Sequence, residues 1–263
     1  MTAIWQNIAI GAFAAFLLFS VTWLLSRRAD NYSFVDVTWS YALICLLVIY
    51  AAGTAGDPAR KLIIGIMGAA WALRLGTHIL LRIRAHHPRE DVRYAVMREK
   101  WRGNPGLKFF AFFQAQAALI VLLSLPHLLA MHNPEPGLGL IEWTGAGVWL
   151  AGMIGESVAD WQLKRFKAAS ANRGRVCDAG LWRCSRHPNY FFESVIWWGF
   201  WLFACGSPWG WTTIYAPLLI LWFLLRVTGI PLTEKCAVES KGDAYRAYQR
   251  TTSAFVPWFP RAK

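Results

Sequence analysis

Seven long apolar segments, separated by short polar loops, constrain the fold of this 263-residue chain more than any other feature. A helix needs about 20 apolar residues to cross the hydrocarbon core of a bilayer, and these segments approach or exceed that length. The chain is therefore predicted to be all-α, a polytopic bundle of seven transmembrane helices. The segments cover residues of about 4–25, 34–52, 62–82, 108–131, 138–158, 190–206 and 211–230.

The distribution of positive charge predicts the orientation of this bundle. The formal net charge is +12, but the Lys and Arg residues lie in a few short segments between the apolar runs. That distribution is typical of membrane topology, so nucleic-acid binding is not expected. The basic loops 82–108 and 162–189 are expected in the cytoplasm with the C-terminus, and the N-terminus is expected outside. Arg60 and Lys61 lie on the opposite side and depart from this rule.

Three further observations narrow the class of protein. The N-terminal segment lacks the basic start and the small-residue cleavage site of a signal peptide, so it is expected to remain as the first helix. The five cysteines are scattered, and the near pair Cys177 and Cys184 lacks the other ligands of a zinc site; we expect neither a metal nor a structural disulfide. Because no repeat or long linker divides the chain, residues 1–263 are predicted to form one transmembrane domain.

Function is expected where polar side chains interrupt the apolar frame, because an ionisable group at membrane depth is costly unless it faces a partner or a wet cavity. Asp36 begins the second segment, and Arg74 and His78 lie one turn apart in the third. Asn189 and Glu193 are four residues apart, so they share one face of the sixth. A further set with the same spacing, on the fifth helix, comprises Glu156, Asp160 and Lys164.

A structural explanation is open for the same residues. The polar residues of the fifth helix could form only a ladder along that helix near the interface, and Arg74 could pair with Asp36 merely to hold two helices together. The basic loops are equally open to two interpretations. Arg173, Arg175 and their neighbours could hold the phosphates of a dinucleotide, because guanidinium groups are permanently charged and bidentate. They could instead be positive-inside residues that anchor lipid headgroups.

Two stretches of the C-terminal half carry a resemblance to a known family. "GLWRCSRHPNYFFESVIWWGFWLFA" and "LLRVTGIPLTEKCAVESKGDAYRAYQRTTSAFVPWFP" resemble bacterial membrane proteins related to steroid 5-alpha-reductases, a family mostly of undefined function. "NYSFVDVTWSY", "LRLGTHILLRIR" and "EDVRYAVMREKW" resemble its N-terminal half, so the likeness covers nearly the whole chain. It implies a seven-helix monomer in the bacterial inner membrane that reduces an activated C=C bond of a lipid, which enters from the bilayer.

The resemblance also implies that NADPH is the cofactor and lies among the cytoplasmic halves of the helices, mainly within residues 138–263. The chain has no G-x-G-x-x-G turn between a strand and a helix, so a helical pocket must replace a Rossmann site. Asn189 and Glu193 are expected at the nicotinamide end. The full expected set of cofactor-binding residues comprises Asp160, Lys164, Arg173, Arg175, Arg183, Arg186, His187, Asn189, Tyr190, Glu193, Arg226 and Glu234.

The residues expected to bind the substrate carbonyl depart from the family pattern. Steroid 5-alpha-reductases resembling this chain use a Gln-Glu pair on the second helix and a Tyr on the third, which are not found here. Reduction of an enone needs a donor at the carbonyl oxygen and then a proton. Arg74 is the expected donor, with Asp36 to orient it, and Tyr41 or Tyr94 is expected to supply the proton.

Two other classes of function compete with that of a reductase. Isoprenylcysteine carboxyl methyltransferases and related phospholipid methyltransferases resemble the chain in "RHPNY", in a following glutamate and near "YRAYQRTTSAFVP". Their cofactor, S-adenosylmethionine, carries no phosphate, so the many arginines favour NADPH. A transporter or scaffold would instead place polar groups near the bilayer midplane between repeated halves, which this sequence lacks.

Overall fold

The computed structural model describes residues 2–260, and their regular structure is helical, as predicted. The chain divides into two compact units. The N-terminal unit extends to residue 139 and includes 204–210, and the C-terminal unit comprises 140–203 and the chain from 211 onward. The interpretation of residues 1–263 as one transmembrane domain stays a prediction.

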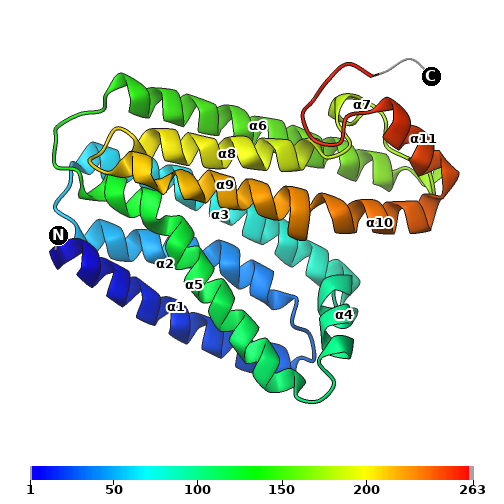
Figure 1. Ribbon diagram of the computed structural model, residues 1–263, viewed down its shortest axis with the longest axis horizontal. Coiled ribbons are helices and arrows are strands. Elements are labelled where there is room, and N and C mark those ends of the chain that lie inside the picture. The colour runs from blue at the N-terminus through cyan, green and yellow to red at the C-terminus, as the bar shows by residue number, and fades with distance from the viewer. Residues whose placement is uncertain (1, 261–263) are drawn as a thin grey trace. The chain divides into compact units, whose positions relative to one another are not determined.

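The N-terminal unit is built around α2, which contacts α1, α3 and α5 (Figure 1). Its core is aromatic: Tyr50 of α2 and Trp71 of α3 are fully buried, with Phe109 and Phe113 of α5. Prolines at the first helical turn and side-chain caps define where α3 and α5 begin, since Asp57 accepts from Arg60 N and Asn104 from Leu107 N. The helices are α1 (Thr2–Arg28), α2 (Phe34–Gly53), α3 (Pro58–His86), α4 (Val92–Lys100) and α5 (Pro105–His132).

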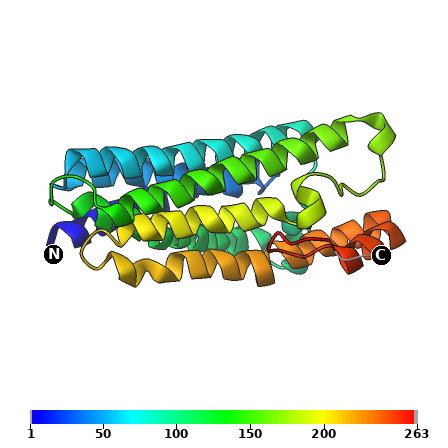
Figure 2. The same ribbon diagram turned by 90° about the horizontal axis from the view of Figure 1, so that it is seen from above.

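The C-terminal unit contains three long helical rods, α6, α8 and the line formed by α9 and α10, which lie side by side in two perpendicular views (Figures 1 and 2). Short helices follow α6 and α10. The elements are α6 (Leu140–Ala168), η1 (Ser170–Asn172), α7 (Leu181–Cys184), α8 (Pro188–Ala204), η2 (Gly210–Ile214), α9 (Tyr215–Trp222), the π-helix η3 (Phe223–Val227), α10 (Ile230–Lys241) and α11 (Asp243–Thr251).

Glycines allow α6 and α8 to approach closely. A Cβ atom on Gly145 of α6 would come within 2.3 Å of the Phe203 backbone nitrogen, and one on Gly199 of α8 within 2.5 Å of the Trp149 nitrogen. Gly152 of α6 continues this contact, since a Cβ there would come within 2.7 Å of Ile196 Cγ1. Small residues at such contacts are typical of membrane helices, where close packing replaces the hydrophobic effect as the driving force.

The helix that runs from α9 to α10 is interrupted by η3 and Gly229. Pro231 lacks an N–H, and its ring would clash with the carbonyl four residues earlier in a regular helix, so the α-helical pattern cannot continue through this point. Thr228 N and Gly229 N both donate to Phe223 O, at 3.0 and 3.3 Å. The break places Arg226 on the widened turn.

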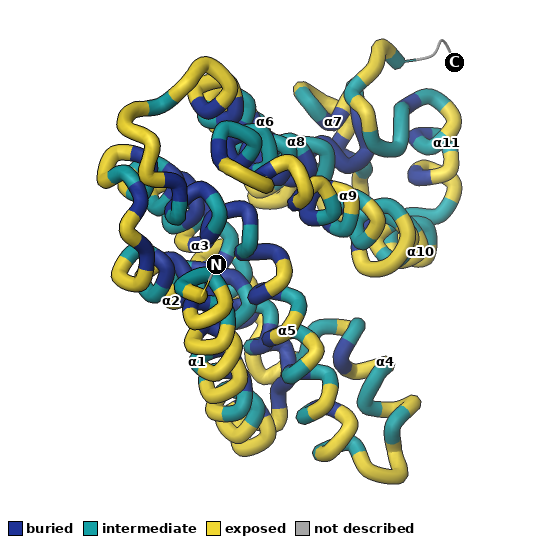
Figure 3. Tube along the Cα trace, turned by 60° about the vertical axis from the view of Figure 1, so that its left-hand side comes forward, coloured by how far each residue is buried: buried dark blue, intermediate teal, exposed yellow. Residues whose placement is uncertain are grey.

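Five helical segments are long and apolar enough to cross a membrane: α1, α2, α3, α5 and residues 210–241. These match five of the seven predicted crossings. The surface of α1 is largely exposed (Figure 3) and carries large apolar side chains, as expected of a lipid-facing helix. The other two predicted crossings correspond to α6, which carries Glu142, Glu156 and Asp160, and α8, whose 17 residues span about 25 Å. Seven crossings and their orientation therefore stay a prediction.

Arg60 and Lys61, which departed from the positive-inside pattern, have structural roles in the N-terminal unit. Arg60 is buried and donates to the carbonyl oxygens of Asn133 at 3.2 Å and Glu135 at 2.6 Å. Lys61 Nζ donates to Thr54 O at 2.7 Å. Both side chains donate to backbone carbonyls where helices end, so a structural role explains why these two cations lie on this side.

Candidate functional site

The residues predicted from the sequence fall into two groups, one in each unit. The four expected catalytic residues lie in the N-terminal unit, on α2, α3 and α4, and all twelve expected cofactor-binding residues lie in the C-terminal unit. The structure brings several members of each group together.

Asp36, at the start of α2, is bound by two residues of α4. Its Oδ2 accepts from Arg93 at 2.6 Å, and its Oδ1 accepts from the Tyr94 hydroxyl at 2.7 Å. Asp36 is thus held by α4, and its expected role in orienting Arg74 stays a prediction. The helix 92–100, expected as part of a loop, places a guanidinium and a phenol directly against the carboxylate.

Further ionic contacts fix α4 against the segment that precedes α2. Asp91 caps α4, accepts from Arg93 Nε at 2.9 Å and donates its backbone N–H to Ser33 Oγ at 2.9 Å. Glu90 accepts from Tyr32 N at 2.6 Å. These residues were not predicted as a group, although the acids and arginines spaced closely in "EDVRYAVMREKW" indicate such ion pairs.

The surroundings of Tyr94 make it a poor proton donor. The side chain is buried, and burial together with the nearby Asp36 carboxylate raises the pKa of Tyr94 well above its ordinary value. Its hydroxyl proton is already committed to Asp36. Of the two tyrosines expected to supply a proton, Tyr41 is therefore the better candidate.

Tyr41 belongs to a polar group at the α2–α3 contact. Its hydroxyl lies 3.0 Å from Thr77 Oγ1, and its ring packs on Gly76, where a Cβ would come within 2.6 Å. Arg74 lies one turn before Thr77 on α3. One turn after Asp36 on α2, Trp39 packs edge-to-face on Trp71, and its indole N–H is buried without a hydrogen-bond partner among the described residues.

In the C-terminal unit, Glu234 of α10 is the centre of a polar cluster. Its Oε1 accepts from Arg186 Nε at 2.6 Å and lies 3.2 Å from His187 Nε2, and its Oε2 accepts from Gln249 Nε2 at 2.9 Å. Arg186 also donates to the carbonyl oxygens of Gln249 and Thr252. Three hydrogen bonds within the protein thus occupy the Arg186 guanidinium.

These contacts change the interpretation of two expected cofactor residues. Arg186 was expected near the phosphates, but its side chain is buried and tied to Glu234 and to backbone carbonyls. Glu234 was expected to bind the cofactor, and both of its oxygens are engaged by residues of the same unit. The pair joins α10, α11 and the segment before α8, so its direct role in the structure is to hold these elements together.

The first turns of α8 carry the remaining expected contacts. Asn189 Nδ2 donates to Asp160 Oδ1 of α6 at 3.4 Å, which joins two predicted cofactor residues. Tyr190 stacks on His187, with ring centroids 5.3 Å apart. Glu193 is buried and accepts from Trp197 Nε1 at 2.9 Å, one turn along its own helix.

Five expected cofactor residues are exposed cations that form no ion pair among the described residues. Three of them lie in the loop between α6 and α8, where η1 and α7 are short and the backbone turns through Gly174 and Gly180 at positive φ. One lies at the end of α6, and one lies in η3. They are Lys164, Arg173, Arg175, Arg183 and Arg226.

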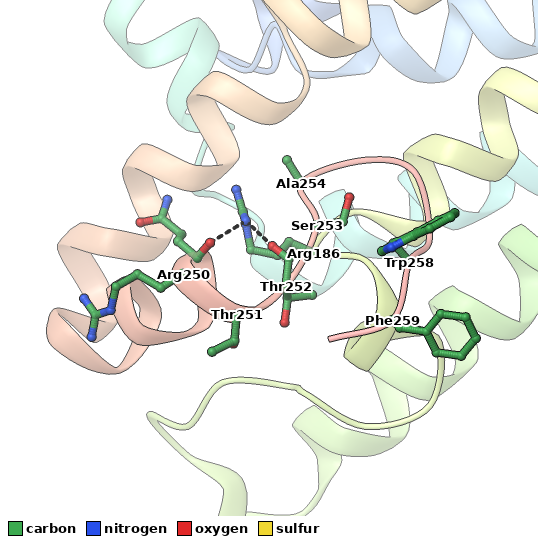
Figure 4. Close-up of a pocket in the computed structure, with 9 residues that line it drawn as sticks. Arg186, Arg250, Thr251, Thr252, Ser253, Ala254, Trp258 and Phe259 are labelled. Carbon is green, nitrogen blue, oxygen red and sulfur yellow. Dashed lines mark hydrogen bonds between the residues drawn. The ribbon is translucent and has the colours of Figure 1, made fainter. Parts of the chain in front are cut away.

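A pocket of about 360 Å³ lies beside Arg186, between α11 and the chain that follows it (Figure 4). Its lining includes Arg250, Thr251, Ser253 and Trp258. Apart from Arg186, no predicted cofactor residue lines it, so this pocket is distinct from the expected cofactor site.

A family model and a relative from yeast each match most of this chain. A family model described as "Protein of unknown function (DUF1295)" matches residues 22–252. The uncharacterized protein C594.04c of Schizosaccharomyces pombe is 29% identical over 276 residues, which cover 94% of this chain and 79% of that protein. No solved structure matches the chain. Because the family model spans the chain from within α1 to the end of α11, this protein belongs to the DUF1295 family.

Proposed function

We propose that this protein is an NADPH-dependent membrane reductase that acts on the activated C=C bond of a steroid-like or other lipid enone. The observation that carries the proposal is the group of unpaired, exposed guanidiniums in the loop between α6 and α8, at Arg173, Arg175 and Arg183. Charged groups without internal partners are suited to a polyanionic ligand, and guanidinium binds phosphate bidentately. S-adenosylmethionine has no phosphate to meet them.

The residues at the start of α8 fit the other end of such a cofactor. Asn189 and Asp160 meet across α6 and α8, and together they present an amide and a carboxylate that suit a carboxamide group. When bound, NADPH would supply a hydride to the substrate. The chain's own part is to orient the nicotinamide through Asn189 and Glu193 and to hold the phosphates with the exposed arginines. Arg186 would act indirectly, by fixing the loop on which those arginines lie.

The substrate side of the proposal rests on the membrane helices of the N-terminal unit. Arg74, Trp39 and Tyr41 carry polar groups within segments that are otherwise apolar. A buried indole N–H or a guanidinium could stabilise the charge that develops on a carbonyl oxygen. Tyr41, hydrogen-bonded to Thr77, could then deliver the proton. We also propose that α6 and α8 complete seven crossings of a bacterial inner membrane, with the N-terminus outside.

The experiment is NADPH oxidation by the protein purified in lipid nanodiscs, with a 3-oxo-4-ene steroid as the first enone. The parent should oxidise NADPH only when the enone is present, and Tyr41→Phe should lose far more of that activity than Tyr94→Phe. Methyl transfer from S-adenosylmethionine to a lipid, without NADPH oxidation for any hydrophobic enone, would replace the proposal with the methyltransferase alternative.

A further inference from the structure

Residues 252–260, the described part of the chain after α11, form no helix, yet their backbone is fixed at three points. Arg186 N donates to Ser253 O at 2.8 Å, Ser185 Oγ donates to Phe255 O at 2.8 Å, and Trp258 N donates to Cys184 O at 2.9 Å. Residues 253–259, which we call the strap, therefore follow a defined course along the segment that precedes α8.

The strap holds large aromatic side chains outward. Trp258 is 69% exposed and Phe259 is 83% exposed, although the backbone beside them is hydrogen-bonded. The hydrogen bond of Trp258 N thus holds the backbone at a position from which both rings are exposed. Tryptophan is enriched where membrane meets water, because its ring is apolar and its N–H is polar.

The strap also lies close to the end of a candidate membrane crossing. Glu234 belongs to the segment 210–241, and Arg186 bridges it to Thr252, the residue that precedes the strap. Gln249 of α11 bonds the same carboxylate. These contacts place the strap beside the last turns of that segment.

The pocket beneath the strap supplies groups that bind phosphate. Arg250 contributes an exposed guanidinium, Ser253 contributes a hydroxyl, and Trp258 and Phe259 form an apolar wall (Figure 4). Arg250 forms no ion pair among the described residues. A pocket lined by a guanidinium at one end and by aromatic rings at the other matches a phosphodiester that continues into an apolar chain (Figure 4). The net charge of +12 favours an anionic partner over a zwitterionic one.

We infer that the strap and its pocket bind the headgroup of an anionic phospholipid at the membrane surface. Arg250 contacts the phosphate, and Trp258 and Phe259 lie at the boundary with the acyl chains. This interaction is separate from the proposed reductase activity, because it uses none of the exposed arginines of the cofactor site.

The test is hydrogen–deuterium exchange of the full-length protein in nanodiscs of phosphatidylcholine alone or of phosphatidylcholine with phosphatidylglycerol. Amides of the strap should exchange about five-fold more slowly with phosphatidylglycerol, the effect of one arginine near an anionic surface. Arg250→Gln should abolish the difference. Arg246→Gln is the matched control, since Arg246 is also exposed on α11 but pairs with Asp243 and does not line the pocket.

Two outcomes would overturn the inference. Equal exchange of the strap in both lipids would show that no anionic headgroup binds there. Equal protection by inorganic phosphate added to phosphatidylcholine nanodiscs would show that the pocket takes free phosphate rather than lipid. Melting temperatures of both variants identify any loss of folding, which is not expected because both side chains are exposed.

Discussion

Replacing Glu234 with alanine should destabilise the C-terminal unit more than any other single change at its polar cluster. The carboxylate accepts from Arg186 at 2.6 Å and from Gln249 at 2.9 Å, and His187 lies 3.2 Å away. Arg186 is only 9% exposed, so removing its partner leaves a largely buried guanidinium without a counter-ion. Breaking a buried ion pair on one side costs about 3–5 kcal/mol, and the partial exposure of Glu234 favours the lower end, about 3 kcal/mol.

That loss converts into a measurable shift. For a chain of this size, each kcal/mol lowers the melting temperature by roughly 2–4 °C, so Glu234→Ala should melt roughly 6–12 °C below the parent in detergent. Glu239→Ala is the matched control, because Glu239 is an exposed carboxylate on the same helix. If Glu234→Ala and Glu239→Ala both have the melting temperature of the parent, the cluster does not hold α10, α11 and the segment before α8 together.

Further predictions concern packing, pH and the substrate side. Gly145→Val should lower the melting temperature in detergent because the valine side chain would strike the Phe203 backbone. Gly147→Val should not, because the space beside Gly147 is open. Equal melting temperatures of the two variants would refute the close approach of α6 and α8. Burial raises the pKa of Asp91, but the Arg93 guanidinium lowers it by more, so the pKa lies below its ordinary value. Asp91 therefore stabilises the fold at pH values above that ordinary pKa, and this contribution is lost as the pH falls further. Asp91→Asn should flatten the acid side of the profile of melting temperature against pH, and an unchanged profile would contradict this. Trp39→Phe should reduce enone turnover while the melting temperature changes little, and unchanged turnover would remove the indole from the proposed carbonyl contact.

The membrane helices could be predicted because their signal is local. Each apolar run carries its own length and composition, so the segments 34–52 and 108–131 appear as α2 and α5 with nearly the same ends. The helix α4 was missed because its nine residues are too few to carry a clear apolar period, and its position depends on the contact of Arg93 with Asp36, which is distant in sequence.

The partners of charged residues were harder to predict for the same reason. Asn189 and Asp160 were expected together and meet at 3.4 Å, since the resemblance placed both at one site. Arg186 looked like its exposed neighbours in the basic loop, and only the folding of α11 onto α10 shows that its donors are used internally. Spacing along one helix is visible in a sequence, whereas pairing between helices depends on tertiary structure.

The central claim is that the protein binds NADPH. The measurement that tests it most directly is equilibrium binding of NADPH and of S-adenosylmethionine to the purified protein, with quenching of tryptophan fluorescence as the readout. NADPH should bind, S-adenosylmethionine should not, and replacing a contacting arginine among Arg173, Arg175 and Arg183 with alanine should weaken NADPH binding about 10- to 150-fold, the effect of one charge-assisted hydrogen-bonding group. Arg102→Ala, an exposed arginine of the N-terminal unit, should bind NADPH as the parent does. Binding of S-adenosylmethionine in place of NADPH, or NADPH affinity unchanged in all three loop variants, would contradict the account.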